Sequence, residues 1–168
     1  MQGLIKEANV FDYVTWRSDL SFENSPINKI DILILIQLAI VNFDGIVPAL
    51  CDDFKDISLE DAYHQFEKEK RLENKIGLII PNTVLSLFKN IHNTKRYKQI
   101  KMSDYIDIIS IEKEEQVSAI TFEIDKDTFL IGFSGTDDTI IGWKENFNMI
   151  YKFPVESQIE ANNYVNKV

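Results

Sequence analysis

The stretch that decides the fold is Thr128-Phe129-Leu130-Ile131-Gly132-Phe133-Ser134-Gly135-Thr136-Asp137-Asp138-Thr139, continued by Ile140-Ile141-Gly142-Trp143-Lys144-Glu145-Asn146-Phe147. Residues 128–133 are apolar, aromatic or β-branched without alternation, which is typical of a strand buried on both faces. Gly135 lets the chain turn, and Asp138 or Thr139 can cap a helix that follows. We therefore expect a strand, a sharp turn and a helix, an arrangement that points backbone N–H groups into one small space suited to an anion or an oxyanion.

Part of this stretch resembles a block found in the class 3 lipases, which are α/β-hydrolases. The block reads Phe-Arg-Gly-(Ser/Thr)…Trp…Asp, and it corresponds here to Phe133-Ser134-Gly135-Thr136, Gly142-Trp143 and Glu145-Asn146. Residues 133–149 more narrowly resemble the uncharacterised bacterial Mbeg-like family of lipase-related proteins, and residues 9–22 resemble its opening. The sequence departs from these patterns at Ser134, Asn146 and Ser18, where they have Arg, usually Asp and commonly Gly. These departures alter the charge pairing around the turn that the family patterns imply.

The resemblance implies an α/β fold in which N-terminal helices pack on a small mixed sheet, as in the front part of a lipase-like α/β-hydrolase. It implies that Gly135, Thr136 and Asp137 form the oxyanion loop, with Trp143 and Asn146 as structural support. In that family pattern the next strand carries the nucleophile, and Val168 ends the sequence where this strand should begin. We therefore expect the N-terminal part of a lipase- or esterase-like serine hydrolase. A simple strand-to-helix connection is the alternative for the turn.

No residue of the sequence is predicted to be catalytic. The nearest approach to a Gly-x-Ser-x-Gly nucleophile elbow is Gly132-Phe133-Ser134-Gly135-Thr136, and both histidines, His64 and His92, precede it, whereas the hydrolase order places histidine after the nucleophile. The chain should thus be inactive alone, with an acyl ester as the substrate of the complete protein. The alternative function is a non-catalytic acidic module that binds a protein partner.

Charge and composition argue against binding to nucleic acid, membranes, metals and cofactors. The formal charge of −9 opposes binding to nucleic acid or to an anionic membrane, and the basic residues at 95, 96, 98 and 101 are expected to form a solvated loop. The lone Cys51 and the absence of a His/Cys cluster predict no metal, and nothing indicates a cofactor. The apolar run 30–41 is too short to span a membrane, for which about 20 residues are needed. Without an export signal, we expect a cytoplasmic protein.

Periodicity predicts one domain over residues 1–168, with a helical region at about 9–92 and a sheet region at about 100–168. Helices are expected at 11–17, with Trp16 facing the core; at 28–41, started by Ser25-Pro26 and buried all round; at 58–70; after Pro81-Asn82; and at 154–167. Strands are expected at 105–111, 117–124 and 128–133, the last two joined by a hairpin turn at Asp125-Lys126-Asp127. An unpaired edge at 128–133 predicts self-association or a protein partner.

Overall fold

The computed structural model describes residues 7–51, 55–73, 83–112, 115–134 and 147–168. Its sheet has four strands in the order β1 (Ile57–Ser58), β2 (Lys101–Ser110), β3 (Glu115–Asp125) and β4 (Thr128–Ser134), and each neighbouring pair is antiparallel. The expected α/β fold with a mixed sheet is thus corrected to α+β. Short reversals connect β2 to β3 and β3 to β4, and strands joined in this way pair antiparallel, whereas parallel pairing needs a longer crossover.

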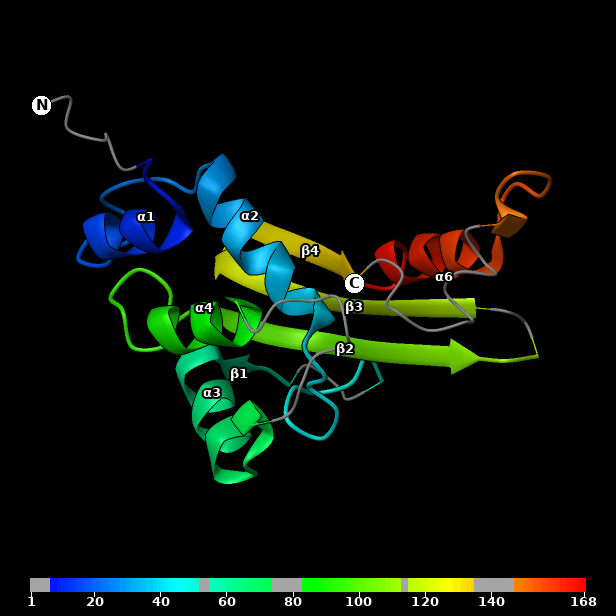
Figure 1. Cartoon of the computed structure of the whole chain (residues 1–168), viewed down its shortest axis with the longest axis horizontal. Helices are drawn as coiled ribbons and strands as arrows, with labels where there is room; N and C mark the ends of the chain where they lie inside the picture. The colour runs from blue at the N-terminus through cyan, green and yellow to red at the C-terminus, as the bar shows by residue number, and fades with distance from the viewer. Residues whose placement is uncertain (1–6, 52–54, 74–82, 113–114, 135–146) are drawn as a thin grey trace, which may run out of the picture.

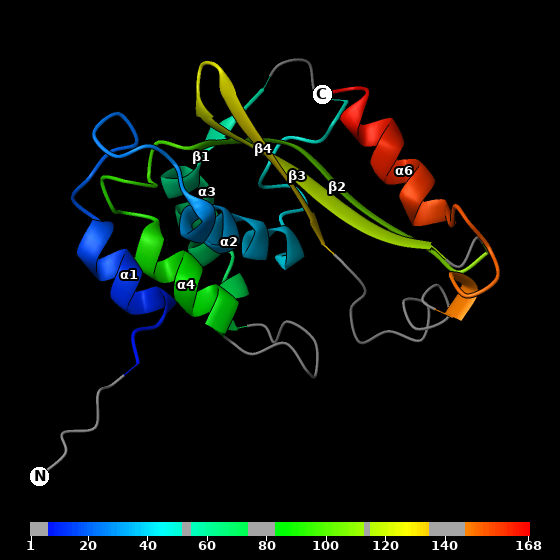
Figure 2. The same cartoon turned by 90° about the horizontal axis from the view of Figure 1, so that it is seen from above.

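Helices cover the two faces of the sheet unequally (Figures 1 and 2). One face carries most of the helices, and the other carries only α6 among the described residues. The helices are α1 (Val10–Arg17), α2 (Lys29–Gln37), α3 (Leu59–Lys68), α4 (Thr83–Ile91) and α6 (Glu156–Val165), with short 3₁₀ helices η1 (Leu38–Ile40) and η2 (Arg71–Glu73). No helix in the described ranges is both long and apolar enough to cross a membrane.

Side-chain caps fix where the first helices begin. Asn9 caps α1 and Ser58 caps α3. The helix predicted from residue 28 begins within one residue of that position, but Ser25-Pro26 does not start it. Instead the Asn28 side chain accepts the Ile30 N–H at 2.9 Å while the Asp31 carboxylate accepts the Asn28 N–H at 3.0 Å. This reciprocal capping box sets the first turn at Lys29.

The expectation that α2 is buried on every side is also wrong. Ile34 and Leu35 are fully buried, whereas Ile30 and Leu33 are 42% and 50% exposed, because α2 contacts the sheet through only part of its circumference. Trp16 of α1 is likewise 64% exposed and not in the core. By contrast, α4 buries the apolar residues that its spacing predicts, namely Val84, Leu85, Leu87, Phe88 and Ile91.

The three predicted strands are confirmed, but β4 is not buried on both faces. It pairs with β3 on one side, and no strand pairs with its other edge among the described residues. Phe129 is 61% exposed and Phe133 is 38% exposed on the face that carries α6. The opposite face is tightly packed at Gly132, where a Cβ atom would lie 3.2 Å from the Cβ of Ala39. An apolar run without alternation therefore marks an edge strand here.

Candidate functional site

The site predicted from the sequence lies at the end of β4. Its residues Gly135, Thr136, Asp137, Trp143 and Asn146 lie outside the described residues. The structure does describe the strand that leads to them, which ends at Ser134 opposite Ser118 of β3. The Ser118 hydroxyl donates to the Ala39 carbonyl oxygen at 3.1 Å and so ties this end of the sheet to η1.

The two histidines lie together, but far along the chain from β4. The ring of His92 stacks on Tyr63 of α3 with 3.8 Å between centroids, and the ring of His64 meets His92 at 5.6 Å. The His92 Nδ1 atom is 2.7 Å from the Lys89 carbonyl oxygen, which requires an N–H at Nδ1. In the described part of the chain, no contact joins either imidazole to a serine or cysteine nucleophile. The pair forms an aromatic cluster at the surface of α3 and α4.

A buried ionic network lies where the sequence predicts a solvated basic loop. Asp31 and Arg96 are 0% and 2% exposed, and their side chains form a bidentate pair at 2.8 and 2.5 Å. The Tyr97 hydroxyl donates to the same carboxylate at 2.6 Å, and the Tyr13 hydroxyl donates at 3.1 Å. The expectation of a solvated loop is therefore wrong for Arg96 and Tyr97. The run of basic residues gave no sign that the Arg96 guanidinium pairs with Asp31 of α2, which lies 65 positions earlier in the sequence.

This network joins three segments of the helical layer. Arg96 also donates to the backbone carbonyls of Leu20, Ser25 and Pro26 at 3.1–3.4 Å, and its guanidinium carbon lies 4.2 Å from the centroid of the Phe22 ring. Burial raises the pKa of Asp31, but hydrogen bonds from Arg96 and Tyr97 outweigh it and hold that pKa below its usual value. An aspartate held ionised in this way fixes the geometry of the layer and is unsuited to proton transfer.

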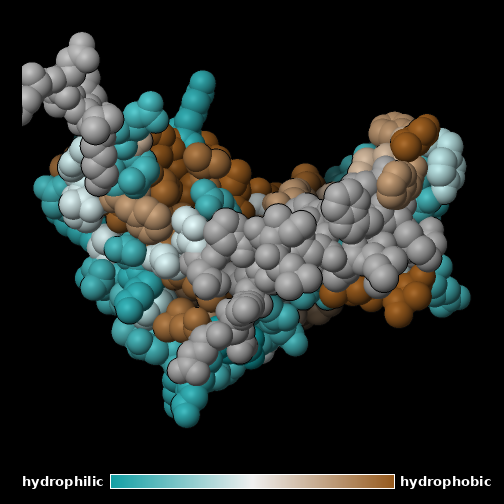
Figure 3. All heavy atoms as spheres, viewed as in Figure 1, coloured by the Kyte–Doolittle hydropathy of each residue, from teal (hydrophilic) through white to brown (hydrophobic). Residues whose placement is uncertain are grey.

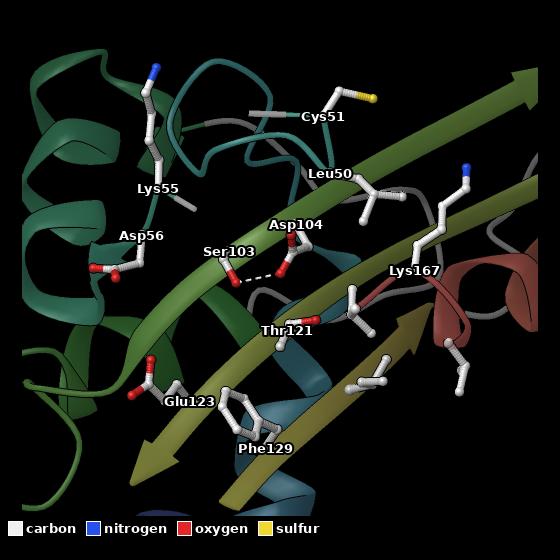
Figure 4. Close-up of a pocket in the computed structure, with 13 residues that line it drawn as sticks. Leu50, Cys51, Lys55, Asp56, Ser103, Asp104, Thr121, Glu123, Phe129 and Lys167 are labelled. Carbon is white, nitrogen blue, oxygen red and sulfur yellow. Dashed lines mark hydrogen bonds between the residues drawn. The ribbon is translucent and has the colours of Figure 1, made fainter. Parts of the chain in front are cut away.

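A pocket of about 770 Å³ opens on the face of the sheet that carries α6 (Figure 4). Its floor follows from the strand register, which aligns Ser103, Thr121 and Ile131 in one row and Lys101, Glu123 and Phe129 in the next. The C-terminal end of α6 lies over the first of these rows, where the Tyr164 hydroxyl is 2.7 Å from the Thr121 hydroxyl. The second row is left open, and Leu50, Cys51, Lys55 and Asp56 form the side wall.

Two polar groups of the pocket, Ser103 and Asp104, come from an irregularity in β2. The pairing register with β3 shifts between Ser103 and Ile106, and Asp104 has a φ of +55° in the left-handed region. The Ser103 hydroxyl donates to the Asp104 carboxylate at 2.6 Å. Such bulges redirect side chains and occur often beside functional sites. No signal in the sequence marked this pocket, because the register and the bulge are properties of the assembled sheet.

Comparison with known families identifies one similarity. Residues 91–168 match a family model described as Mbeg1-like. No curated protein and no solved structure matches the chain. Similarity to this family, which the sequence suggested, is thus confirmed over that range, and residues 9–22 lie outside the match.

The Mbeg1-like match covers β2, β3, β4 and α6, and with them the floor of the pocket. Helices α1, α2 and α3 precede it. Arg96 and Tyr97 belong to the matched part, whereas their partner Asp31 does not. The buried network therefore joins the unmatched helix α2 to the matched segment between α4 and β2.

Proposed function

We propose that this chain is the N-terminal part of a lipase- or esterase-like serine hydrolase, whose complete form acts on an acyl ester. The observation that carries the proposal is the order of β4 and α6. β4 runs to Ser134, directly before the Gly135 and Thr136 for which the sequence predicts a turn, and α6 lies across the face of the same sheet. Its support from sequence is the lipase-like block at residues 133–149 and the Mbeg1-like match over 91–168.

In this proposal the turn after β4 holds the oxyanion. The backbone N–H and hydroxyl of Thr136 would face the developing negative charge, and losing one such donor costs on the order of 3 kcal/mol of transition-state stabilisation. The nucleophile and its base would come from outside residues 1–168. Nothing in the sequence supplies a histidine after Ser134, and His92 is stacked on Tyr63.

The purified chain is expected to show no esterase activity on short acyl esters and no labelling by a fluorophosphonate probe. The reason is that an activated serine needs a base within hydrogen-bond reach. Gel fluorescence after incubation with the probe measures this, with Ser134→Ala as the matched variant and an active serine esterase as the positive control. Labelling that disappears in Ser134→Ala would instead make residues 132–136 a nucleophile elbow.

The DNA sequence that follows the codon for Val168 tests whether a nucleophile segment exists, as the hydrolase proposal requires. A Gly-His-Ser-x-Gly segment encoded after the codon for Val168, in the same or a shifted frame, would support the hydrolase assignment. A product that includes this segment should hydrolyse acyl esters, and Thr136→Ala should then lower kcat more than it changes KM, because an oxyanion donor acts on the transition state. A downstream sequence without the segment would remove the hydrolase assignment and leave the second candidate.

The second candidate is a non-catalytic acidic module that binds a protein partner. Exposed apolar residues favour it. One end of the molecule presents the tip of the β2–β3 hairpin and the segment before α6 (Figures 1 and 3). Its exposed apolar side chains are Ile109, Ile111, Phe147, Met149, Ile150, Tyr151 and Phe153, of which Phe153 is 87% exposed. The outer edge of β4, with Phe129 and Phe133, is a further apolar surface. Apolar surface of this extent is typical of interaction sites.

The outer edge of β4 is expected to make the chain self-associate at tens of micromolar, the concentration range in which exposed strand edges commonly associate. Phe129→Lys should shift the protein toward monomer, because a charge on an edge strand opposes edge-to-edge pairing and the new side chain would lie opposite Glu123. Sedimentation velocity over a concentration series measures the change.

Ile111→Lys is the matched control, because it makes the same substitution on the exposed hairpin and not on β4. If Ile111→Lys dissociates the protein and Phe129→Lys does not, association occurs through the hairpin end of the molecule. A wild-type monomer that unfolds cooperatively at these concentrations would show that the chain is a self-sufficient domain and would contradict the hydrolase-fragment proposal.

A further inference from the structure

The pocket on the α6 face is separate from the turn predicted to hold an oxyanion. It lies over the beginning of β4, at Phe129 and Ile131, whereas the turn follows the end of β4 at Ser134. Its volume of about 770 Å³ falls in the range of small-molecule sites, roughly 300–1,000 Å³. A ligand assigned to it therefore adds to the proposed function and does not depend on it.

Among the charged groups around the pocket, the Asp104 carboxylate is the one suited to a further cation. Asp56, Asp104 and Glu123 line the pocket, and in the described part of the chain Asp104 makes no ion pair, its hydrogen-bond donor being the Ser103 hydroxyl at 2.6 Å. Figure 4 shows the amino groups of Lys55 and Lys167 at the rim, directed away from the strands that form the floor. Of the three carboxylates, that of Asp104 lies beside Ser103 over the strands of the floor.

One ammonium group already occupies part of this surface. The Lys101 Nζ atom lies 3.3 Å from the Asp56 carboxylate and 3.7 Å from the Glu123 carboxylate. Lys101 therefore shows how the aliphatic stem of a lysine can lie along the sheet while its ammonium group reaches two acids. The Asp104 carboxylate offers a single acid, further along β2, to a second ammonium group.

An apolar strip extends from this carboxylate across the sheet. Phe129, which stands next to Glu123 in the register, exposes 61% of its surface, and Ile131, Leu50 and Val165 complete the strip. Asp104 on β2 and Ile131 on β4 are two strand spacings and one residue apart in the register, roughly 10 Å, and an ammonium ion with a chain of about six carbons can contact both.

We propose that this pocket binds an organic ammonium ion carrying an aliphatic chain, with the ammonium group on the Asp104 carboxylate and the chain directed across Thr121 toward Ile131. An anionic ligand at this position would meet the Asp104 carboxylate, which makes no ion pair in the described part of the chain. A neutral apolar ligand would cover the Asp104 carboxylate without pairing it, which is unfavourable. The same chemistry is offered by a free alkylamine and by the lysine side chain of another protein.

The test is a titration of the 15N-labelled chain, kept below its association concentration, with hexylammonium chloride. Hexylammonium is expected to bind at least about 10-fold more tightly than 1-hexanol, because a charge-assisted contact to carboxylate is added, and hexanoate should not bind. The amide signals of Ser103, Asp104, Thr121 and Ile131 should move. Equal binding of hexylammonium and 1-hexanol, or shifts confined to other residues, would overturn the proposal.

Asp104→Asn is the most direct test of the proposed contact between the ammonium group and the Asp104 carboxylate. Asparagine tolerates the left-handed backbone and can still accept the Ser103 hydrogen bond, so the change removes mainly the charge. It should weaken hexylammonium binding about 10-fold while 1-hexanol binding stays the same. Asp127→Asn, an equal change of charge on the exposed β3–β4 turn, should have no effect. Equal weakening by both variants would show general attraction to an acidic protein and would overturn the site.

The source of the cation is distinguished by a second ligand. Nα-acetyl-lysine methylamide carries the lysine side chain with a peptide backbone on either side. Binding of this compound as tight as that of hexylammonium supports recognition of a protein lysine, whereas binding of hexylammonium alone supports a free alkylamine. If neither compound shifts the pocket signals, the proposal is wrong.

Discussion

Replacing Asp31 with alanine is expected to lower the free energy of unfolding by about 3–5 kcal/mol, because it leaves the buried Arg96 guanidinium without its counter-charge. Arg96 would keep the backbone carbonyls of Leu20, Ser25 and Pro26, which are dipoles and cannot balance a full charge. The change also removes the capping contact from Asp31 to the Asn28 N–H. Urea unfolding followed by circular dichroism measures the loss.

Asp56→Ala is the matched control, because Asp56 also pairs with a basic residue but its side chain is 41% exposed. Exposed pairs contribute roughly 0–1 kcal/mol, so this variant should unfold close to wild type. Similar losses for Asp31→Ala and Asp56→Ala would mean that the Asp31–Arg96 pair is not buried as the structure has it.

The same pair makes a definite contribution to the pH dependence of stability. Hydrogen bonds from Arg96 and Tyr97 lower the pKa of Asp31 in the folded chain below its ordinary value of 3.8. A lowered pKa stabilises the fold at every pH above that ordinary value, and the contribution disappears as pH falls through the folded-state pKa. The stability difference between wild type and Asp31→Asn should therefore be constant near neutral pH and shrink only below about pH 4.

Local sequence patterns predicted the secondary structure correctly where an element packs against a single surface of the core. Helix α4 shows this, since its apolar residues recur at helical spacing and all face the same core. The β3–β4 hairpin shows it as well, because Asp125-Lys126-Asp127 interrupts two strand-like runs and the strands pair across it. In both cases the residues that fix the geometry lie within a few positions of one another.

Long-range partners limited the prediction elsewhere. The sequence around Arg96 is basic and polar, so it indicated solvent, yet its counter-charge is Asp31 on another helix. A carboxylate inside the apolar run 30–41 was the one available signal, because a charge in a buried helix requires a partner. For β4, an unbroken apolar run could not distinguish a strand flanked on both sides from an edge strand with exposed Phe129.

The two candidate sites, the turn predicted after β4 and the pocket around Asp104, also differ in whether nearby or distant residues define them. The turn at Gly135 and Thr136 could be suggested from a short sequence block, because a strand followed by glycine and a helix cap is a local pattern. The pocket around Asp104 could not, since Ser103, Thr121 and Phe129 come together only through the register of three strands. Similarity between short blocks can therefore indicate a turn, while a pocket floor needs the assembled sheet.

Replacing Tyr164 with alanine is the second change expected to have a large effect, about 3–5 kcal/mol in the free energy of unfolding or the undocking of α6. Tyr164 is 1% exposed, and its ring contacts Phe133 of β4 with 5.6 Å between centroids. Its hydroxyl lies 2.7 Å from Thr121 of β3. Within α6, Tyr164 is the only fully buried residue that the structure describes, so the helix depends on it for its position.

Two variants separate packing from hydrogen bonding at this position. Tyr164→Phe removes only the hydroxyl and should cost about 1 kcal/mol, whereas Tyr151→Ala, at a residue 77% exposed, should stay within about 0.5 kcal/mol of wild type. Urea unfolding gives the energies, and limited proteolysis reports whether α6 is released while the sheet stays folded. If Tyr164→Ala costs no more than Tyr164→Phe, the ring does not anchor the helix. Phe133 directly precedes Ser134, so release of α6 would also uncover the end of β4 from which the predicted oxyanion turn begins.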